Sequence, residues 1–178
     1  SSKGIDCESY TIDSTPHDKD YFESQLIALD HYFMSVSYGQ FGIDLEDSDV
    51  FPSNQTGSYQ LSETMNYYNP YNKNDSLDMR ITELFEESLI SAYDTDSINF
   101  SAYDLLVVFH AGIGQDFSLP FLDPTPEDIP STYVDQKMIF DNLNETSINI
   151  GDHLINHGII LPETQNHLLF DVAEIMFG

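Results

Sequence analysis

Two histidines four residues apart have a spacing that can bind a metal ion if the segment is helical. His153 and His157 lie in the sequence His-Leu-Ile-Asn-His. On a helix, this spacing puts both imidazoles on one face, where they can share a zinc ion. On a strand, the two residues lie about 13 Å apart at roughly 3.3 Å per residue, and zinc–nitrogen bonds are only about 2 Å long. The flanking glycines and the following Ile-Ile favour a strand or hairpin, so two surface histidines are expected and zinc is the alternative.

His110 is a candidate for binding or orienting a substrate. It follows an apolar run at 105–109 and precedes a turn that contains Gly112 and Gly114. Sheets in α/β proteins place binding groups at the C-terminal ends of their strands. The alternative is a structural histidine whose ring nitrogens hydrogen-bond the backbone of a loop. The turn lacks the Lys-Ser/Thr of a phosphate-binding loop, so phosphate is not its expected ligand.

Glu163 and His167 are four residues apart at the start of an expected helix. This spacing places them on one side of the helix, where a Glu/His pair can ligate zinc or carry out acid–base catalysis. The alternative is that Glu163 is a carboxylate favoured by the positive end of the helix dipole. Both residues are therefore weak catalytic candidates.

Two clusters of oxygen-bearing side chains are candidates for binding calcium, which takes six to eight oxygen ligands. The first cluster is Asp94, Asp96 and Asn99, and the second is Asp116, Asp123, Glu127 and Asp128. Neither matches the complete calcium loop, because the first lacks its glycine and its terminal glutamate. No pattern in the chain supplies a complete set of catalytic residues.

The apolar run at 105–109 predicts the element that positions these residues. A short continuous apolar run bounded by turn residues is typical of a strand buried on both faces. We therefore expect a buried central strand near 104–110 and an α/β layer fold, with helices above and below the sheet. Further strands are expected at 132–140 and 147–161, with a turn at Gly151-Asp152, and the segment 41–51 is expected to be extended.

Apolar residues at helical spacing predict packing helices near 16–37, 77–93 and 164–177. The first follows Thr15 and Pro16, a favourable cap and first residue, and the last has an apolar face of Leu168, Leu169, Val172, Ile175 and Met176. Residues 1–14 are expected to be a loose segment. Residues 15–178 are expected to form a single α/β domain or the N-terminal portion of a larger one.

The charge of the chain excludes some classes of partner. It has 31 Asp and Glu against 5 Lys and Arg, which gives a formal net charge of -26. Binding to nucleic acid needs clustered cations, so it is excluded, and an anionic membrane is disfavoured for the same reason. No apolar run is long enough to insert into a membrane. An acidic surface suits calcium or keeps a protein soluble in salt.

Three segments of the chain resemble the N-terminal part of the secreted immune-inhibitor-A-like zinc metallopeptidases. They are 21–39, the helix expected at 77–93, and 96–112, which includes Asn99 and the sequence His110-Ala111-Gly112. The resemblance implies a zincin-like α/β domain with a mixed sheet and a long backing helix. It also implies an extracellular or cell-surface location, a peptide or protein substrate, and zinc held by a downstream His-Glu-x-x-His segment. That segment is absent from residues 1–178, so none of the family's zinc ligands maps onto this chain.

Two functions therefore remain open for the chain. It is expected to be the scaffold part of a metallopeptidase-like domain, inactive alone, whose partner is the remainder of its own longer chain. The full protein would be an active peptidase or a pseudoenzyme. The alternative is a non-catalytic secreted or surface module for binding or structure, dependent on calcium or on the tyrosine-rich segment 59–71. Tyrosine is frequent at interfaces, which supports the second reading.

The excess of negative charge predicts that added salt stabilises the protein. Screening weakens the repulsion between like charges on the surface. We expect the melting temperature, measured by circular dichroism, to rise with NaCl concentration at pH 7. An unchanged melting temperature would show that the acidic residues do not repel one another appreciably.

Overall fold

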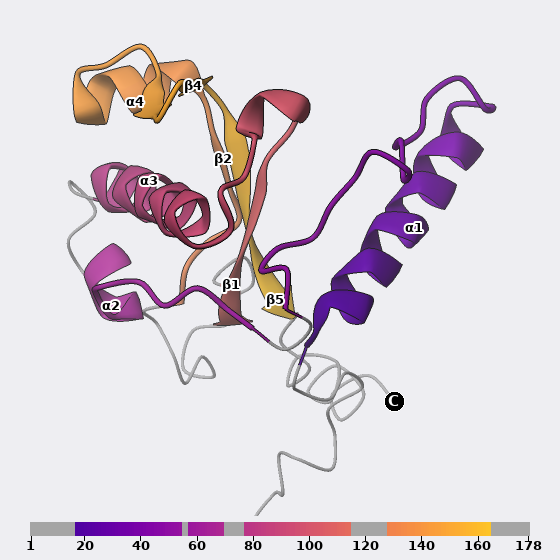
Figure 1. Ribbon diagram of the computed structural model, residues 1–178, viewed down its shortest axis with the longest axis horizontal. Coiled ribbons are helices and arrows are strands. Elements are labelled where there is room, and N and C mark those ends of the chain that lie inside the picture. The colour runs from indigo at the N-terminus through magenta and orange to yellow at the C-terminus, as the bar shows by residue number, and fades with distance from the viewer. Residues whose placement is uncertain (1–16, 55–56, 70–76, 115–127, 165–178) are drawn as a thin grey trace, which may run out of the picture.

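A computed structural model describes residues 17–54, 57–69, 77–114 and 128–164 (Figure 1). The helices in these ranges are α1 (Lys19–Val36), α2 (Met65–Tyr68), α3 (Leu77–Asp96), the 3₁₀ turn η3 (Phe100–Ala102) and α4 (Gln136–Leu143). The strands are β1 (Val107–Ile113), β2 (Thr132–Val134), β3 (Ile148–Ile150), β4 (His153–Ile155) and β5 (Gly158–Thr164). The described residues therefore have an α/β composition.

The main sheet has the strand order β1-β5-β2 and is mixed. β5 lies in the centre, runs parallel to β1 and pairs antiparallel with β2. β3 and β4 form a separate antiparallel hairpin. Gly151 adopts a positive φ of 57° in the hairpin turn, a conformation that glycine takes without steric cost. The expected turn at Gly151-Asp152 is confirmed.

The prediction of a buried central strand near 104–110 is wrong in two respects. The strand begins at Val107, and in the described sheet it lies at an edge, while β5 is central. Its residues alternate between two faces: His110 is buried, whereas Val107 and Phe109 are 37% and 38% exposed. Successive residues of a strand point to opposite faces of the sheet, so a continuous apolar run means that both faces of β1 are apolar. The helices of the described core cover only one of these two faces.

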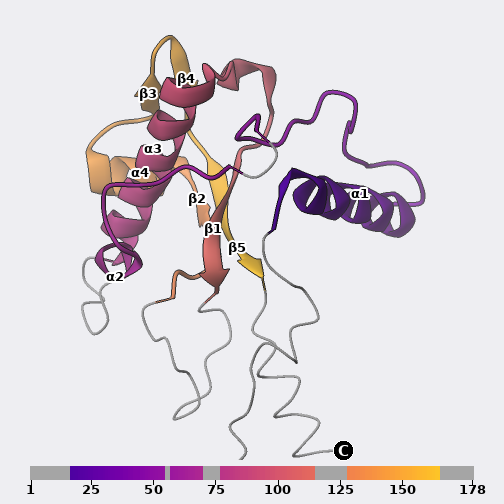
Figure 2. The same ribbon diagram turned by 60° about the horizontal axis from the view of Figure 1, so that its bottom comes forward.

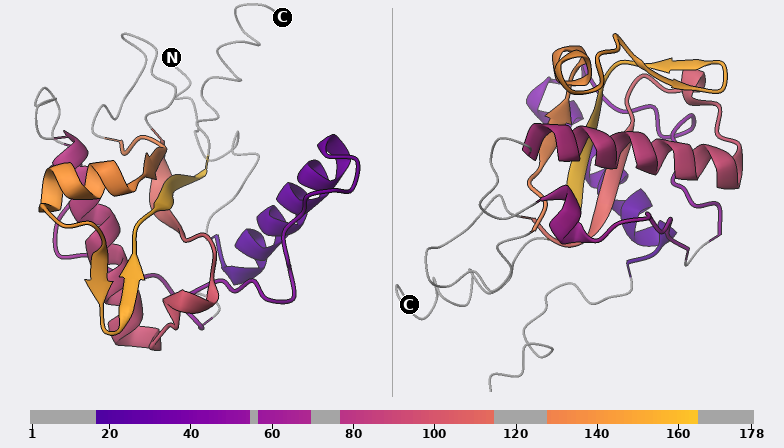
Figure 3. Two further views of the ribbon diagram at one scale, coloured as in Figure 1. Left: turned by 90° about the horizontal axis from the view of Figure 1, so that it is seen from above. Right: turned by 90° about the vertical axis from the view of Figure 1, so that its left-hand side faces the viewer.

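The core lies between the sheet and α3, with α4 beside α3 on the same side (Figures 1 and 2). Figure 3 shows α3 crossing the strands. Phe85 of α3, Ile139 of α4 and Ile160 of β5 are completely buried. The other apolar core residues are Tyr68, Ile81, Leu84, Leu89, Ala92, Ile98, Phe100, Ile129, Val134, Ile148, Ile150 and Ile155.

α1 lies on the opposite side of the sheet from α3 (Figures 1 and 2). It begins three residues later than expected, because its N-cap is Asp18 and not Thr15: the Asp18 carboxylate accepts a hydrogen bond from the backbone N–H of Tyr21. The Tyr21 hydroxyl donates to the backbone carbonyl of Glu163 at 3.1 Å, and the rings of Phe22 and Phe109 lie 4.7 Å apart. The first turn of the helix thus contacts the sheet, yet no residue of α1 is buried.

The segment after α1 folds back along the helix. The ring of Phe41 packs edge-on against Phe33, with centroids 5.0 Å apart. The backbone N–H of Ile43 donates to the Asp30 carboxylate at 2.8 Å. These local contacts hold residues 41–43 without a strand, so the extended segment expected at 41–51 forms no ladder.

The remaining expectations have mixed outcomes. The helix expected at 77–93 is confirmed as α3. The strand expected at 132–140 is wrong beyond Val134, because the Asp135 carboxylate caps α4 by accepting the backbone N–H of Met138 at 2.7 Å. The expected strand region 147–161 comprises β3, β4 and the start of β5. Residues 1–14 and the helix expected near 164–177 lie outside the described residues, except for Thr164, which belongs to β5.

Truncating Ile160 should destabilise the fold strongly. Its side chain is completely buried in the central strand, and Ile→Ala substitutions in cores cost about 2–5 kcal/mol of unfolding free energy. We expect Ile160→Ala to show this loss in urea denaturation. Leu154→Ala is the control, because Leu154 is 73% exposed, and its loss should stay within about 0.5 kcal/mol. Equal losses in the two variants would contradict the core described above.

Candidate functional site

Glu163 lies near the C-terminal end of β5 and joins three segments. One carboxylate oxygen accepts the backbone N–H of Gly112 at 2.9 Å, and the other lies 3.3 Å from Nδ1 of His17. The His17 side chain is only 2% exposed and stacks on the Tyr21 ring at 4.1 Å. The sequence predicted Glu163 at the start of a helix, but the residue lies in the strand β5. Its predicted partner His167 lies outside the described residues.

The pairing of Glu163 with His17 could not be found from sequence spacing. The two residues lie almost at opposite ends of the chain, and no pattern links them. The pair connects the start of α1 to the parallel strands β1 and β5. It is a polar cluster at the sheet end where α/β proteins place binding groups.

His110 lies at the same end of the sheet and is 8% exposed. Its Nδ1 is 3.0 Å from the backbone carbonyl of Ala111, and its Nε2 is 3.1 Å from that of Ile129. A neutral imidazole has one N–H and donates to only one of these carbonyls. The ring ties the segment around Ile129 to the end of β1, and both of its nitrogens face backbone.

His153 and His157 lie on β4 and on the connection to β5, so their spacing is not helical. The Nδ1 of His153 is 2.8 Å from the Ser101 hydroxyl. The Nε2 of His157 is 3.1 Å from the Asp104 carbonyl, and its Nδ1 is 2.6 Å from the Asn156 side chain. Each ring thus contacts its own local partners.

The calcium candidates are placed separately. Asp96, at the end of α3, accepts hydrogen bonds from the Tyr59 hydroxyl at 2.5 Å and from the backbone N–H of Ser53 at 3.4 Å. Asp94 and Asn99 are exposed, and Asp128 is buried. Asp116, Asp123 and Glu127 lie outside the described residues. Within the described ranges, no three His, Cys, Asp or Glu side chains are grouped so that they could hold a metal ion.

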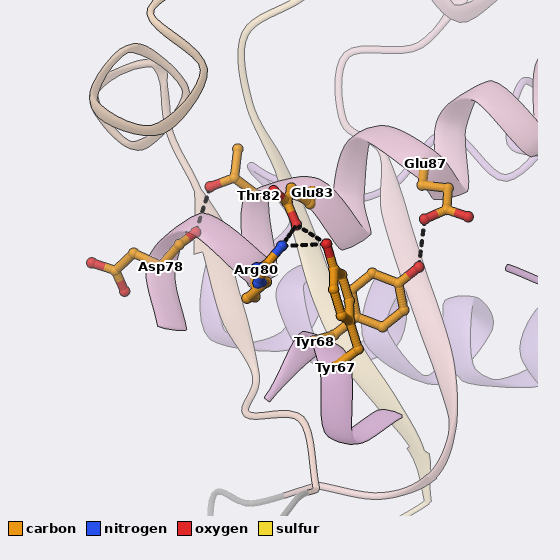
Figure 4. Close-up of polar contacts among 7 residues, drawn as sticks. All are labelled: Tyr67, Tyr68, Asp78, Arg80, Thr82, Glu83 and Glu87. Atoms are coloured by element: carbon orange, nitrogen blue, oxygen red, sulfur yellow. Dashed lines mark hydrogen bonds and ion pairs between the residues drawn. The ribbon is translucent and has the colours of Figure 1, made fainter. Parts of the chain in front are cut away.

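An acidic hollow of about 260 Å³ lies between α3 and the segment that leads into α2. Its lining residues are Ser62, Glu63, Tyr67, Glu83, Glu86, Glu87 and Ile90. Figure 4 shows Tyr67 and Tyr68 directed toward the glutamates of α3. Sequence spacing gives no sign of this hollow, because it forms only where the segment that leads into α2 packs against the glutamates of α3.

Hydrogen bonds hold Glu87 at one side of the hollow. It accepts from the Tyr68 hydroxyl and from the backbone N–H of Ser62 at 2.7 Å. Burial and the bond to Glu87 raise the pKa of Tyr68 to about 12. Burial of the Glu87 carboxyl acts to raise its pKa, but the hydrogen bonds from Tyr68 and Ser62 outweigh this effect and lower the pKa of Glu87.

Arg80 offsets the charge of Glu83 on the other side of the hollow. Its Nη1 lies 2.6 Å from the Glu83 carboxylate, and its guanidinium lies over the Tyr67 ring, 4.1 Å from the centroid. Glu86 has a different environment. Burial, and then the nearby charges of Glu145 and Glu83, raise the pKa of Glu86. The charged form of Glu86 is therefore disfavoured in the fold.

Comparison with known proteins adds no relative. No family model, no curated protein and no solved structure matches this chain. Among the described helices, none has both the length and the apolar character needed to cross a membrane.

Neutralising Glu86 should stabilise the protein at pH 7. Because the pKa of Glu86 is raised in the fold, stability falls as pH rises from the unfolded pKa through the folded one. Glu86→Gln removes this loss, and we expect a gain of about 0.5–1 kcal/mol, the size of a partly exposed charge interaction. The gain should vanish below the unfolded pKa, where the carboxyl is neutral in both states.

Glu46→Gln is the matched control in urea denaturation at pH 7 and pH 3.5. Glu46 is exposed, and its substitution changes the net charge by the same amount. An equal gain in both variants would show that overall charge, and not the surroundings of Glu86, sets the effect.

Proposed function

We propose that this chain forms the N-terminal scaffold part of an extracellular zinc-metallopeptidase-like domain. The observation that carries the proposal is where the three resembling segments lie. Segment 21–39 contains most of α1, segment 77–93 is most of α3, and segment 96–112 contains η3 and most of β1. In the fold, α1 and α3 lie on opposite sides of the mixed sheet, and β1 is one of its strands.

The arrangement of His110, His153 and His157 does not fit a zinc site. Both ring nitrogens of His110 and of His157, and Nδ1 of His153, lie within 3.1 Å of a backbone or side-chain partner. None of them belongs to a group of three potential ligands within the described ranges. The proposal therefore assigns zinc to a downstream His-Glu-x-x-His segment and assigns no catalytic step to this chain. Its role is to position that segment and to supply one side of the substrate cleft near His110.

The alternative proposal is a non-catalytic binding or structural module of a secreted or surface protein. The net charge of -26 supports it, since such a surface concentrates divalent cations. The two proposals differ in which metal the protein retains and in whether any peptide is cleaved.

The scaffold proposal predicts that residues 1–178 alone neither retain zinc nor cleave peptides. After loading with zinc and dialysis, elemental analysis should find well under one zinc per chain, and labelled casein should stay intact. His153→Ala with His157→Ala is the control and should leave both results unchanged. Zinc retained by the chain and lost in this double variant would overturn the assignment of zinc to another segment.

The same assays on the chain extended by the residues that follow it in its own polypeptide test the proposal directly. One zinc per chain with casein cleavage would support an active peptidase. An extended protein that folds without zinc or cleavage, and whose melting temperature rises with calcium but not with an equal ionic strength of NaCl, would favour the binding module.

A further inference from the structure

α1 carries an apolar stripe that remains largely exposed. The stripe comprises Phe22, Leu26, Leu29, Phe33 and Val36. Their separations alternate between four and three residues, so they lie along one side of the helix. Leu29 is 43% exposed and Val36 is 55% exposed, and no residue of the helix is buried. We call these five residues the α1 stripe.

Two aromatic contacts join the α1 stripe to other described elements. The Phe22 ring lies 4.7 Å from that of Phe109 on β1, and the Phe33 ring lies 5.0 Å from that of Phe41. From its first turn, α1 runs away from the sheet (Figures 1 and 3), which leaves the later part of the stripe exposed. A contiguous exposed apolar surface of this kind marks a site where another molecule binds.

Acidic residues flank the α1 stripe. Glu23 and Asp30 each follow a stripe residue by one position and are seven residues apart, so they lie along the same side of the stripe. The range 17–54, which contains α1 and the segment that folds back along it, holds eight Asp and Glu against one Lys. That residue, Lys19, lies 3.7 Å from Glu23. The surface around the stripe therefore has a large excess of negative charge.

We propose that the α1 stripe binds an amphipathic helix of another protein, one with Lys or Arg beside its apolar residues. Helices pack along stripes of this spacing, and the charges that flank the stripe select the partner. α1 has 18 residues and is about 27 Å long at roughly 1.5 Å per residue, so a partner helix of similar length would cover it. The inference does not depend on the proposed function.

Charge complementarity decides between this partner and a second copy of the chain. Two α1 stripes that paired would bring together the same acidic flanks, which repel one another. Each copy also carries a net charge of -26, which opposes association at longer range. A basic helix is attracted instead, and we expect its affinity to fall as NaCl is added, because salt screens that attraction.

A designed peptide tests the proposal with the full chain. The probe is a fluorescently labelled helix as long as α1, with Leu at the stripe spacing, Lys at the flanking positions and Gln elsewhere. Fluorescence anisotropy at physiological salt should show saturable binding of one peptide per chain. Leu29→Ser should raise the dissociation constant about tenfold, as expected for an apolar residue near the centre of an interface. The absence of saturable binding would overturn the proposal.

Ile27→Ser is the matched control variant. Ile27 is 46% exposed and lies on the same helix two residues before Leu29, away from the stripe. Its substitution should change the dissociation constant by no more than about twofold, as expected for a surface position outside the interface. Far-UV circular dichroism verifies that both variants keep their helical content. An equal loss of affinity in the two variants would overturn the assignment of binding to the stripe.

Two further peptides and one measurement without peptide separate the remaining explanations. A peptide of the same composition with its Leu residues spread around the helix should bind far more weakly, and so should one with Glu in place of Lys. Equal binding of the first would reveal general attraction to an acidic protein, and equal binding of the second would refute charge selection. Sedimentation equilibrium of the chain alone should show a monomer. A dimer that Leu29→Ser dissociates would overturn the proposal by identifying a second copy as the occupant.

Discussion

The close approach of β5 to α3 is the constraint on which the rest of the fold depends. At Gly158, where β5 begins, a Cβ atom would lie 2.2 Å from the ring of Phe85 and 3.0 Å from the backbone carbonyl of Leu106. Only glycine allows the strand to enter the sheet so near the helix. The next residue, Ile159, donates its backbone N–H to Leu106 at 2.9 Å, which begins the pairing with β1. Ile160 then fills the core.

The second constraint is a shortage of cations. With five Lys and Arg for 31 carboxylates, most acidic groups have no Lys or Arg to pair with, and tyrosine hydroxyls act as donors to several of them instead. Tyr59 bonds Asp96, and Tyr103 bonds Asp49 at 2.6 Å. The latter bond, together with burial, raises the pKa of Tyr103 to about 12. These pairs hold the segments around Asp49, Tyr59 and Tyr68 against the rest of the molecule.

The sequence predicted elements where local signals were strong and failed where distant residues decide. Helical periodicity located α1 and α3 closely, although the cap of α1 is Asp18 and not Thr15, and the glycine turn located the β3–β4 hairpin. The strand expected at 132–140 was misassigned because Asp135 was not recognised as a helix cap. The place of β1 at an edge of the described sheet depends on which strand pairs with which. The apolar content of the run 105–109 does not encode that pairing.

The candidate site was harder to predict than the fold. Glu163 was selected as a carboxylate at a helix start, yet its partners are His17 and the backbone of Gly112, which sequence spacing cannot bring together. The acidic hollow was missed because it forms between α3 and a segment with little periodicity. The prediction of a strand or hairpin for the histidine pair is right for His153, on β4, whereas His157 lies on the connection to β5, and the ring contacts of both are visible only in the folded chain.

The hydrogen bonds between tyrosines and carboxylates affect how the protein responds to salt concentration. The tyrosine hydroxyl is neutral, so it forms no ion pair with the carboxylate. Salt therefore has no second charge in the pair to screen. The segment that leads to α2 is thus fastened by bonds that depend less on salt concentration than ion pairs at the same carboxylates would.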